Sequence, residues 1–306
     1  MQAQTFELPD GTRTVVKWFG ADATPDKGLI AFLPALGVKV DFYSRMAEAL
    51  AQLGYRVAAI EMRGMGDSSV RDVRRHNFGY NEVLNIDLAT VVPALKREAG
   101  DKPFLLAGHS LGGQFALLYA SQHPGEVNGV ILIAGGSNFY GSMPEGAQLK
   151  RRVGLGAVHV IARTLGFFPG HKLGFGGKQP MNMMLDWTQE ALTGRYKVKG
   201  DSTDYDRALG QLDIPVLLLS LSGDALVPKP CADFLARKLR QARVTQVELQ
   251  AKDYGMESFH HFRWAKKAEP VLERVDAWIR AEVGQRSSAR EETPRWPESP
   301  PSAPGL

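Results

Sequence analysis

A serine bracketed by glycines constrains the fold of this chain more than any other feature of its sequence. The segment Gly108-His109-Ser110-Leu111-Gly112 follows the apolar run 103–107 and precedes a run with helical character, 114–120. A serine between a strand and a helix lies on a strained turn, where side chains two residues to either side would collide with the returning backbone. Glycine is favoured at both of those places. The spacing therefore predicts a strand, a tight turn and a helix, with the Ser110 hydroxyl lifted above the edge of a sheet.

Strand-like segments occur along most of the chain and alternate with helical patterns. The first two predict an antiparallel pair joined through Asp10-Gly11, a dipeptide suited to a tight hairpin turn. Continuous apolar runs in later segments indicate parallel strands covered on both faces. We therefore expect an α/β protein with a mostly parallel eight-stranded sheet and helices on both faces. The expected strands lie near residues 4–8, 13–19, 28–33, 55–60, 103–108, 129–134, 214–220 and 244–249.

The clearest helical patterns cover residues 41–53, 81–99, 232–239 and 265–283, and Pro93 should kink or restart the second of them.

Two segments fall outside this alternation of strands and helices. Residues 137–213 combine flexible turns with apolar side chains, which predicts an inserted helical cap or lid. Residues 284–306 are rich in Pro, Ser, Arg and Glu, which predicts a disordered tail. The predicted core therefore comprises residues 1–136 and 214–283.

The predicted cap carries apolar residues that could wall an acyl pocket. Packing of the cap onto the core is the alternative role for each of them. The candidates for contact with a substrate are Phe167, Phe168, Met184 and Trp187.

A serine hydroxyl becomes a useful nucleophile at neutral pH only beside a base, which in turn needs an acid to orient it. Asp224 is the candidate acid because it follows the apolar run 216–220, at the sheet edge where catalytic groups gather. Capping of the next helix is its alternative role. His260 and His261 precede the last expected helix, and adjacent residues cannot both point into one site. We select His261 as the candidate base, with His260 as the alternative.

Acyl transfer also needs two backbone N–H donors for the negatively charged oxygen that forms during the reaction. Leu111, the residue after the serine, is the first candidate. The second should come from residues 34–37, which follow the first parallel strand, with Leu36 as the choice and Ala35 as the alternative. The spacings of histidine, carboxylate and cysteine residues do not match those of metal sites, so we expect hydrolysis without a metal or another cofactor.

The composition argues against several other classes of protein. The net charge is +4, but the basic residues are scattered, and clusters such as 150–152 are interpreted as solvated faces rather than a nucleic-acid site. The sequence has no leader-like start and no apolar run that could span a bilayer, and its single cysteine, Cys231, fits a reducing compartment. We expect a cytoplasmic protein that acts on a small-molecule acyl substrate, with its oligomeric state left open.

These segments together resemble the α/β-hydrolase family. Residues 61–68, Glu-Met-Arg-Gly-Met-Gly-Asp-Ser, are similar to the family's Asp-x-Arg-Gly-x-Gly-x-Ser loop, with Glu61 in place of the commoner Asp. A closer resemblance is to a little-characterised bacterial branch with Pro-Ala-x-Gly at 34–37, Phe-Pro-Gly then Gly-Phe-Gly-Gly within 168–177, and His-Phe-x-Trp at 261–264. The resemblance covers about residues 5–283, and its register favours His261 over His260.

The resemblance implies the family's fold and a triad of Ser110, Asp224 and His261. We expect a serine hydrolase that cleaves a carboxylic ester through an acyl-serine intermediate, because the cap is apolar and has no evident charged pair to bind an amino terminus. An aminopeptidase, with Asp186 or Glu190 near the serine, is one alternative. A thioesterase and an acyltransferase are others. A binding protein that kept the fold without catalysis is a further alternative, although all three triad residue types are present.

Overall fold

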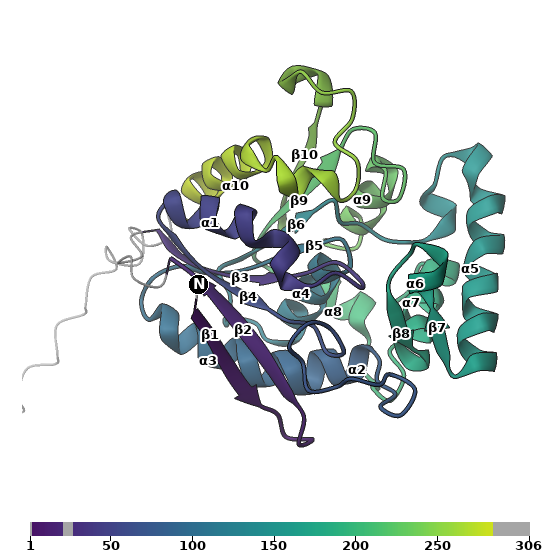
Figure 1. The fold of residues 1–306 in the computed structure, drawn as a ribbon. Coiled ribbons are helices and arrows are strands. Elements are labelled where there is room, and N and C mark those ends of the chain that lie inside the picture. Colours follow the sequence, from purple (N-terminus) through teal and green to yellow (C-terminus); the bar gives the residue numbers. More distant parts are fainter. Residues whose placement is uncertain (1, 21–26, 284–306) are drawn as a thin grey trace, which may run out of the picture.

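The computed structural model describes residues 2–20 and 27–283, and its centre is an eight-stranded sheet (Figure 1). The strand order is β1-β2-β4-β3-β5-β6-β9-β10. β2 pairs antiparallel with β1 and β4, and the other pairs are parallel. The eight predicted strands and the antiparallel first pair are therefore confirmed. The strands are β1 (Gln2–Glu7), β2 (Arg13–Phe19), β3 (Gly28–Leu33), β4 (Tyr55–Ile60), β5 (Phe104–His109), β6 (Gly129–Ile133), β9 (Pro215–Leu221) and β10 (Arg243–Leu249).

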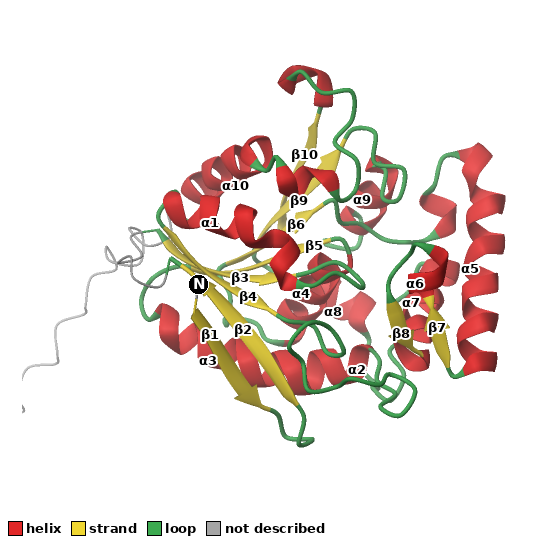
Figure 2. Ribbon diagram, viewed as in Figure 1, coloured by secondary structure: helices red, strands yellow, loops and turns green. Residues whose placement is uncertain are grey.

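Helices cover both faces of the sheet, as predicted (Figure 2). Side chains of a strand alternate between faces. In β3, Leu29 and Leu33 belong to the apolar cluster that includes α3, α4, α8 and α9, whereas Ile30 and Phe32 belong to the cluster on the other face, which includes α1 and α10. Both faces are apolar, which explains the continuous apolar runs of the central strands. These helices are α1 (Ser44–Gln52), α3 (Ala89–Ala99), α4 (Leu111–Gln122), α8 (Tyr205–Gln211), α9 (Lys229–Ala236) and α10 (Glu269–Glu282).

The predicted helix at 81–99 is interrupted. It consists of α2 (Tyr80–Glu82), a π-helical segment (Val83–Leu88) and α3. Pro93 lies inside α3 and has no N–H to donate to the carbonyl of Ala89, four residues earlier. The change from π-helix to α-helix occurs at Ala89, so the restart precedes the proline by one helical turn.

The interval between β6 and β9 corresponds to the segment in which a cap is predicted, and it contains helices and a small sheet. Helix α5 (Glu145–Leu165) packs against α7 (Met181–Thr193), and both lie beyond one end of the sheet (Figure 1). Strands β7 (Phe167–Pro169) and β8 (Lys178–Pro180) form an antiparallel pair around the short helix α6 (Gly170–Leu173). This small sheet was not predicted, because runs of three residues carry too little alternation to indicate a strand. The last helix of the interval, α8, packs against α4 of the core.

The sequence also predicts a disordered tail and the absence of a segment that could span a membrane. The predicted tail, 284–306, lies outside the described residues. Among the helices of residues 2–20 and 27–283, none has the length and apolar character needed to cross a lipid bilayer.

Candidate active site

Ser110 lies at the turn between β5 and α4, and we call residues 108–112 the nucleophile elbow. Its backbone has φ 53° and ψ −117°, a conformation that is strained for a residue with a side chain. A Cβ on Gly108 would lie 2.3 Å from the carbonyl carbon of Gly112, and a Cβ on Gly112 would lie 2.2 Å from the carbonyl oxygen of Leu33. Both glycines are therefore required by close backbone contacts, as the spacing predicted.

The carboxylate of Asp224 holds His261 from the loop that follows β9. Asp224 Oδ2 accepts a hydrogen bond of 2.7 Å from His261 Nδ1, and its Oδ1 accepts the N–H groups of Leu226 and Val227 at 2.9 and 3.1 Å. Helix α9 begins later, at Lys229, so Asp224 stabilises its own turn rather than the start of that helix. Because Nδ1 donates to the carboxylate, Nε2 of His261 is free to accept a proton.

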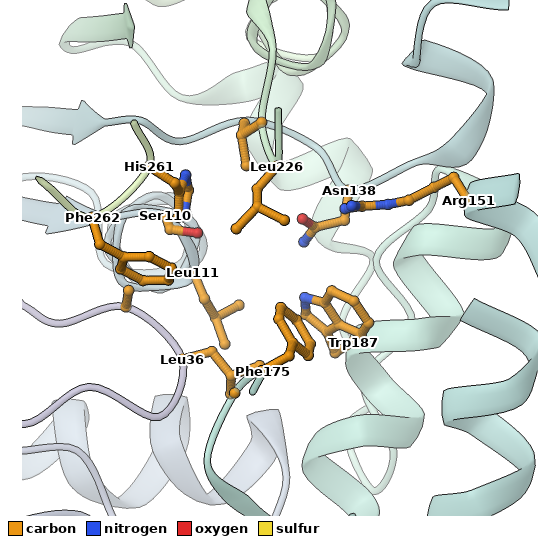
Figure 3. Close-up of a pocket in the computed structure, with 13 residues that line it drawn as sticks. Leu36, Ser110, Leu111, Asn138, Arg151, Phe175, Trp187, Leu226, His261 and Phe262 are labelled. Carbon is orange, nitrogen blue, oxygen red and sulfur yellow. The ribbon is translucent and has the colours of Figure 1, made fainter. Parts of the chain in front are cut away.

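The two adjacent histidines have opposite environments. His261 is buried and lines the same cavity as Ser110, whereas His260 is exposed. His260 has φ 55°, and its N–H donates to the hydroxyl of Ser258. The positive φ turns the chain so that only His261 points inward. Figure 3 shows the His261 ring beside Ser110, whose hydroxyl makes no hydrogen bond within the described residues.

Two backbone amides beside Ser110 remain available to a negatively charged oxygen. Leu111 is the first residue of α4, so its N–H has no acceptor within the helix. In the loop 34–37, which we call the oxyanion loop, Ala35 donates its N–H to the hydroxyl of Tyr43 at 3.2 Å. The N–H of Leu36 makes no hydrogen bond within the described part of the chain. Leu36 and Leu111 line the cavity with Ser110, and this geometry favours Leu36 over Ala35.

His109 contacts several parts of the site, although no pattern in the sequence indicates a role for it. The ring is fully buried, and its Nδ1 forms a hydrogen bond of 2.7 Å with the Tyr43 hydroxyl. It also lies against the His261 ring, with 4.8 Å between ring centroids. Burial lowers the pKa of His109 well below its usual value, so the ring is neutral at pH 7. No spacing rule indicates these contacts, because Tyr43 and His109 are distant in the sequence.

Removal of the Tyr43 hydroxyl tests this connection. We expect Tyr43→Phe to lower stability by about 1–3 kcal/mol, because the Ala35 N–H and the His109 ring lose a buried partner. Because Ala35 precedes Leu36, we also expect a fall of about tenfold in kcat for ester hydrolysis, with KM nearly unchanged. Urea unfolding and steady-state kinetics would measure both effects.

Tyr140→Phe is the matched control, since the hydroxyl of this half-buried tyrosine makes no hydrogen bond within the described residues. A Tyr43→Phe enzyme with unchanged kcat would show that the Tyr43 hydroxyl does not position the oxyanion loop.

The cavity at Ser110 is narrow in this structure, with a volume of about 30 Å³. Of the four cap residues proposed for substrate contact, Trp187 lines this cavity, next to Phe175. Phe167, Phe168 and Met184 do not line it. Phe168 and Met184 are fully buried in the core, and Phe168 packs behind Phe175 with 6.5 Å between ring centroids.

Two polar residues of the cavity were not identified as site residues from the sequence. Asn138 follows β6 and Arg151 belongs to α5, and both point toward the cavity in Figure 3. The basic cluster 150–152 was interpreted as a solvated face, which is wrong for Arg151 and correct for the exposed Arg152. The reason is that successive helical residues differ in direction by about 100°, so neighbours of one charge can face a cavity and solvent.

The carboxylates considered for an aminopeptidase do not line this cavity. Glu190 is buried and accepts hydrogen bonds from the Ser137 hydroxyl and, at 3.0 Å, from the Asn138 N–H. Burial raises its pKa to about 7. Asp186 accepts the N–H groups of Tyr80 and Lys199 at 2.9 and 3.0 Å, and burial raises its pKa to about 6. The carboxylates of Glu190 and Asp186 therefore hold backbone segments in place and do not line the cavity at Ser110.

Comparisons with known proteins agree with the fold. A family model described as "Serine aminopeptidase, S33" matches residues 24–164. Monoglyceride lipase of Mus musculus is 24% identical over 280 residues, which cover 88% of each chain. A structure of DcsB with its substrate analogue has a TM-score of 0.64 and 15% identity, covering 92% of this chain and 99% of that one. The enol-lactonase from Burkholderia xenovorans LB400 has a TM-score of 0.58 and 15% identity, covering 90% and 99%.

Proposed function

Because this chain belongs to the α/β-hydrolase family, we propose that it is a serine hydrolase that cleaves carboxylic esters through an acyl-serine intermediate. Its relatives include monoglyceride lipases of several organisms, so ester hydrolysis is the general activity expected of it. One observation carries the detailed proposal. The 2.7 Å hydrogen bond between His261 and Asp224 orients an imidazole at the cavity into which the strained Ser110 opens.

In the proposed mechanism, Ser110 Oγ attacks the ester carbonyl carbon while His261 Nε2 takes its proton. Asp224 keeps the ring in the required tautomer and stabilises the imidazolium. The N–H groups of Leu36 and Leu111 hold the oxyanion, and loss of one such donor costs about 3 kcal/mol in the barrier. When the intermediate collapses, the imidazolium gives its proton to the departing alcohol and the acyl group stays on Ser110. Water then attacks the acyl-serine with the same base.

The chemistry of the cavity supports an ester over a peptide with a free amino terminus. Such a substrate needs a carboxylate near the serine to bind its ammonium group. The carboxylate of Asp224 lies close by but is hydrogen-bonded to His261. The described residues that line the cavity include no acidic side chain, and the charged residue among them is Arg151. A cation there would repel an ammonium group. Thioesters and acyl transfer to an alcohol use the same triad, and we separate them from ester hydrolysis by experiment.

The proposal is tested by covalent labelling and by turnover. A fluorophosphonate is expected to attach to folded protein at Ser110, identified by mass spectrometry, and heat-unfolded protein is the control. p-Nitrophenyl esters from acetate to long acyl chains are expected to be hydrolysed with an optimum at short to medium length, because the cavity is small. Absence of both label and turnover would favour a binding protein. Labelling without ester turnover would direct the search to thioesters and acyl acceptors.

A further inference from the structure

The guanidinium group of Arg151 is a half-buried cation without a partner in the described part of the chain. Arg151 extends from α5 toward the cavity, and its Nε is inaccessible to solvent and makes no hydrogen bond. The side chain makes no ion pair within the described residues. Burial lowers the pKa of Arg151, because the low-polarity surroundings penalise its charge. Charged groups that are shielded from solvent and lack a partner are costly, and such groups cluster at functional sites, where a ligand can supply the partner.

Asn138 presents a second unpartnered polar group to the cavity that Arg151 lines. The residue is only 6% exposed, and its side-chain amide makes no hydrogen bond within residues 2–20 and 27–283. Its backbone N–H donates to Glu190, which fixes the position of the loop. Asn138 and Arg151 both line the cavity, and in Figure 3 their side chains point toward one end of it, with Ser110 and His261 toward the other.

The acidic residues whose charge acts on Arg151 do not pair with it. Glu190 and Asp224 both contribute favourable charge to it, but neither lies within ion-pair distance. Glu190 is occupied by the loop that follows β6, and Asp224 by His261. The cavity therefore has a net positive end, with guanidinium and amide donors that match the oxygen atoms of a carboxylate or phosphate.

Apolar side chains separate this positive end from Ser110. Leu226 lines one side of the space between them, and Phe175 and Trp187 line another (Figure 3). A ligand that reaches from the serine to Arg151 would therefore place hydrocarbon in the middle and an anionic group at its end.

We propose that Arg151 and Asn138 form a subsite for an oxyanion group, so that the preferred substrates are esters that carry a carboxylate or phosphate a few carbon atoms from the scissile carbonyl. This inference rests on the proposed function and names its substrate class. The anionic group pairs with Arg151 and accepts a hydrogen bond from the Asn138 amide. The hydrocarbon between the two groups contacts the apolar walls, and the ester carbonyl lies at Ser110.

A matched pair of substrates tests the preference. Mono-p-nitrophenyl glutarate carries a terminal carboxylate, and the p-nitrophenyl ester of monomethyl glutarate is its neutral counterpart. After correction for uncatalysed hydrolysis, which the free carboxylate accelerates, we expect a higher kcat/KM for the anionic ester. Arg151→Gln should lower kcat/KM for that ester by about 10- to 100-fold, the loss expected for a charged hydrogen bond, and change the neutral ester by less than about threefold. Asn138→Ala should have the same selectivity with a smaller effect.

Arg152→Gln is the control variant, because it removes the same charge from the next residue, which is exposed. It is expected to hydrolyse both esters as the wild type does. Equal losses on the two esters in Arg151→Gln, or no preference in the wild type, would overturn the subsite and leave ester hydrolysis intact.

Binding without turnover separates this inference from the proposed function. We expect glutarate or glycerol 3-phosphate to raise the Tm of the wild type but not that of Arg151→Gln, and sodium chloride at equal ionic strength is the control. Stabilisation by one compound alone identifies the group as carboxylate or phosphate. If neither compound stabilises the wild type, the subsite is wrong even where esters are cleaved. If one does so through Arg151 while no ester is cleaved and no fluorophosphonate attaches, the subsite holds and the proposed function fails.

Discussion

Ser110→Ala is expected to lower kcat/KM for p-nitrophenyl ester hydrolysis by about four to six orders of magnitude, the range typical when one member of such a triad is removed. The residual rate would come from the oxyanion donors and from substrate binding. His261→Ala should lose a similar amount, because the nucleophile and the base act as a unit. Asp224→Asn should lose about 10⁴-fold, since the amide favours the wrong tautomer of the ring.

His260→Ala is the matched control for this series. The two histidines are adjacent, but His260 is exposed and His261 is held by Asp224. We therefore expect His260→Ala to keep kcat/KM within about threefold of the wild type. A loss in His260→Ala that equals the loss in His261→Ala would contradict the assignment of the base. Circular dichroism of each variant would exclude unfolding as the cause.

Among the substitutions considered for this protein, Gly112→Ala is expected to lower the free energy of unfolding the most. In an open helix this change would stabilise the protein by up to about 1 kcal/mol. Here the added Cβ would lie 2.2 Å from the carbonyl oxygen of Leu33 and 2.5 Å from that of Pro34, and both are backbone atoms that cannot rotate away. The start of α4 would have to move from the oxyanion loop, and we expect a net loss of about 2–4 kcal/mol in the free energy of unfolding.

The same displacement should reduce activity. Leu36 is in the oxyanion loop and Leu111 begins α4, so moving these elements apart separates the two proposed oxyanion donors. We expect kcat to fall by about 100-fold or more. Gly154→Ala is the control, because a Cβ at Gly154 in α5 would meet no atom within 4 Å and should leave activity unchanged. Urea unfolding would measure both proteins. A Gly112→Ala variant as stable as the wild type would contradict the contact argument.

Local patterns were sufficient to predict much of the fold. The continuous apolar runs of the central strands arise because helices cover both faces of the sheet, and they located these strands to within a few residues. The two glycines around Ser110 located the nucleophile elbow, since a Cβ at either place meets backbone. The family resemblance implied Asp224 and His261, and their hydrogen bond in the structure agrees with that assignment.

The residues that the sequence analysis missed depend on contacts between distant parts of the chain. His109 joins Tyr43 from another segment, and nothing in the spacing of either residue predicts their hydrogen bond. Arg151 and Arg152 are adjacent and equal in charge, yet one lines the cavity and the other faces solvent. Only the packing of α5 against α7 decides which side of that helix faces inward.

The sequence by itself therefore determined the α/β fold, its strands and the strained serine, because apolar periodicity and glycine spacing reflect the steric needs of each element and of its immediate neighbours. Tertiary structure decided which histidine points inward, which amide of the oxyanion loop stays unpaired, and which arginine enters the cavity. These outcomes depend on backbone direction and on hydrogen bonds between segments far apart in the chain. The Ala35 amide, occupied by Tyr43, is one such case, because its neighbour Leu36 is left free only once the chain is folded.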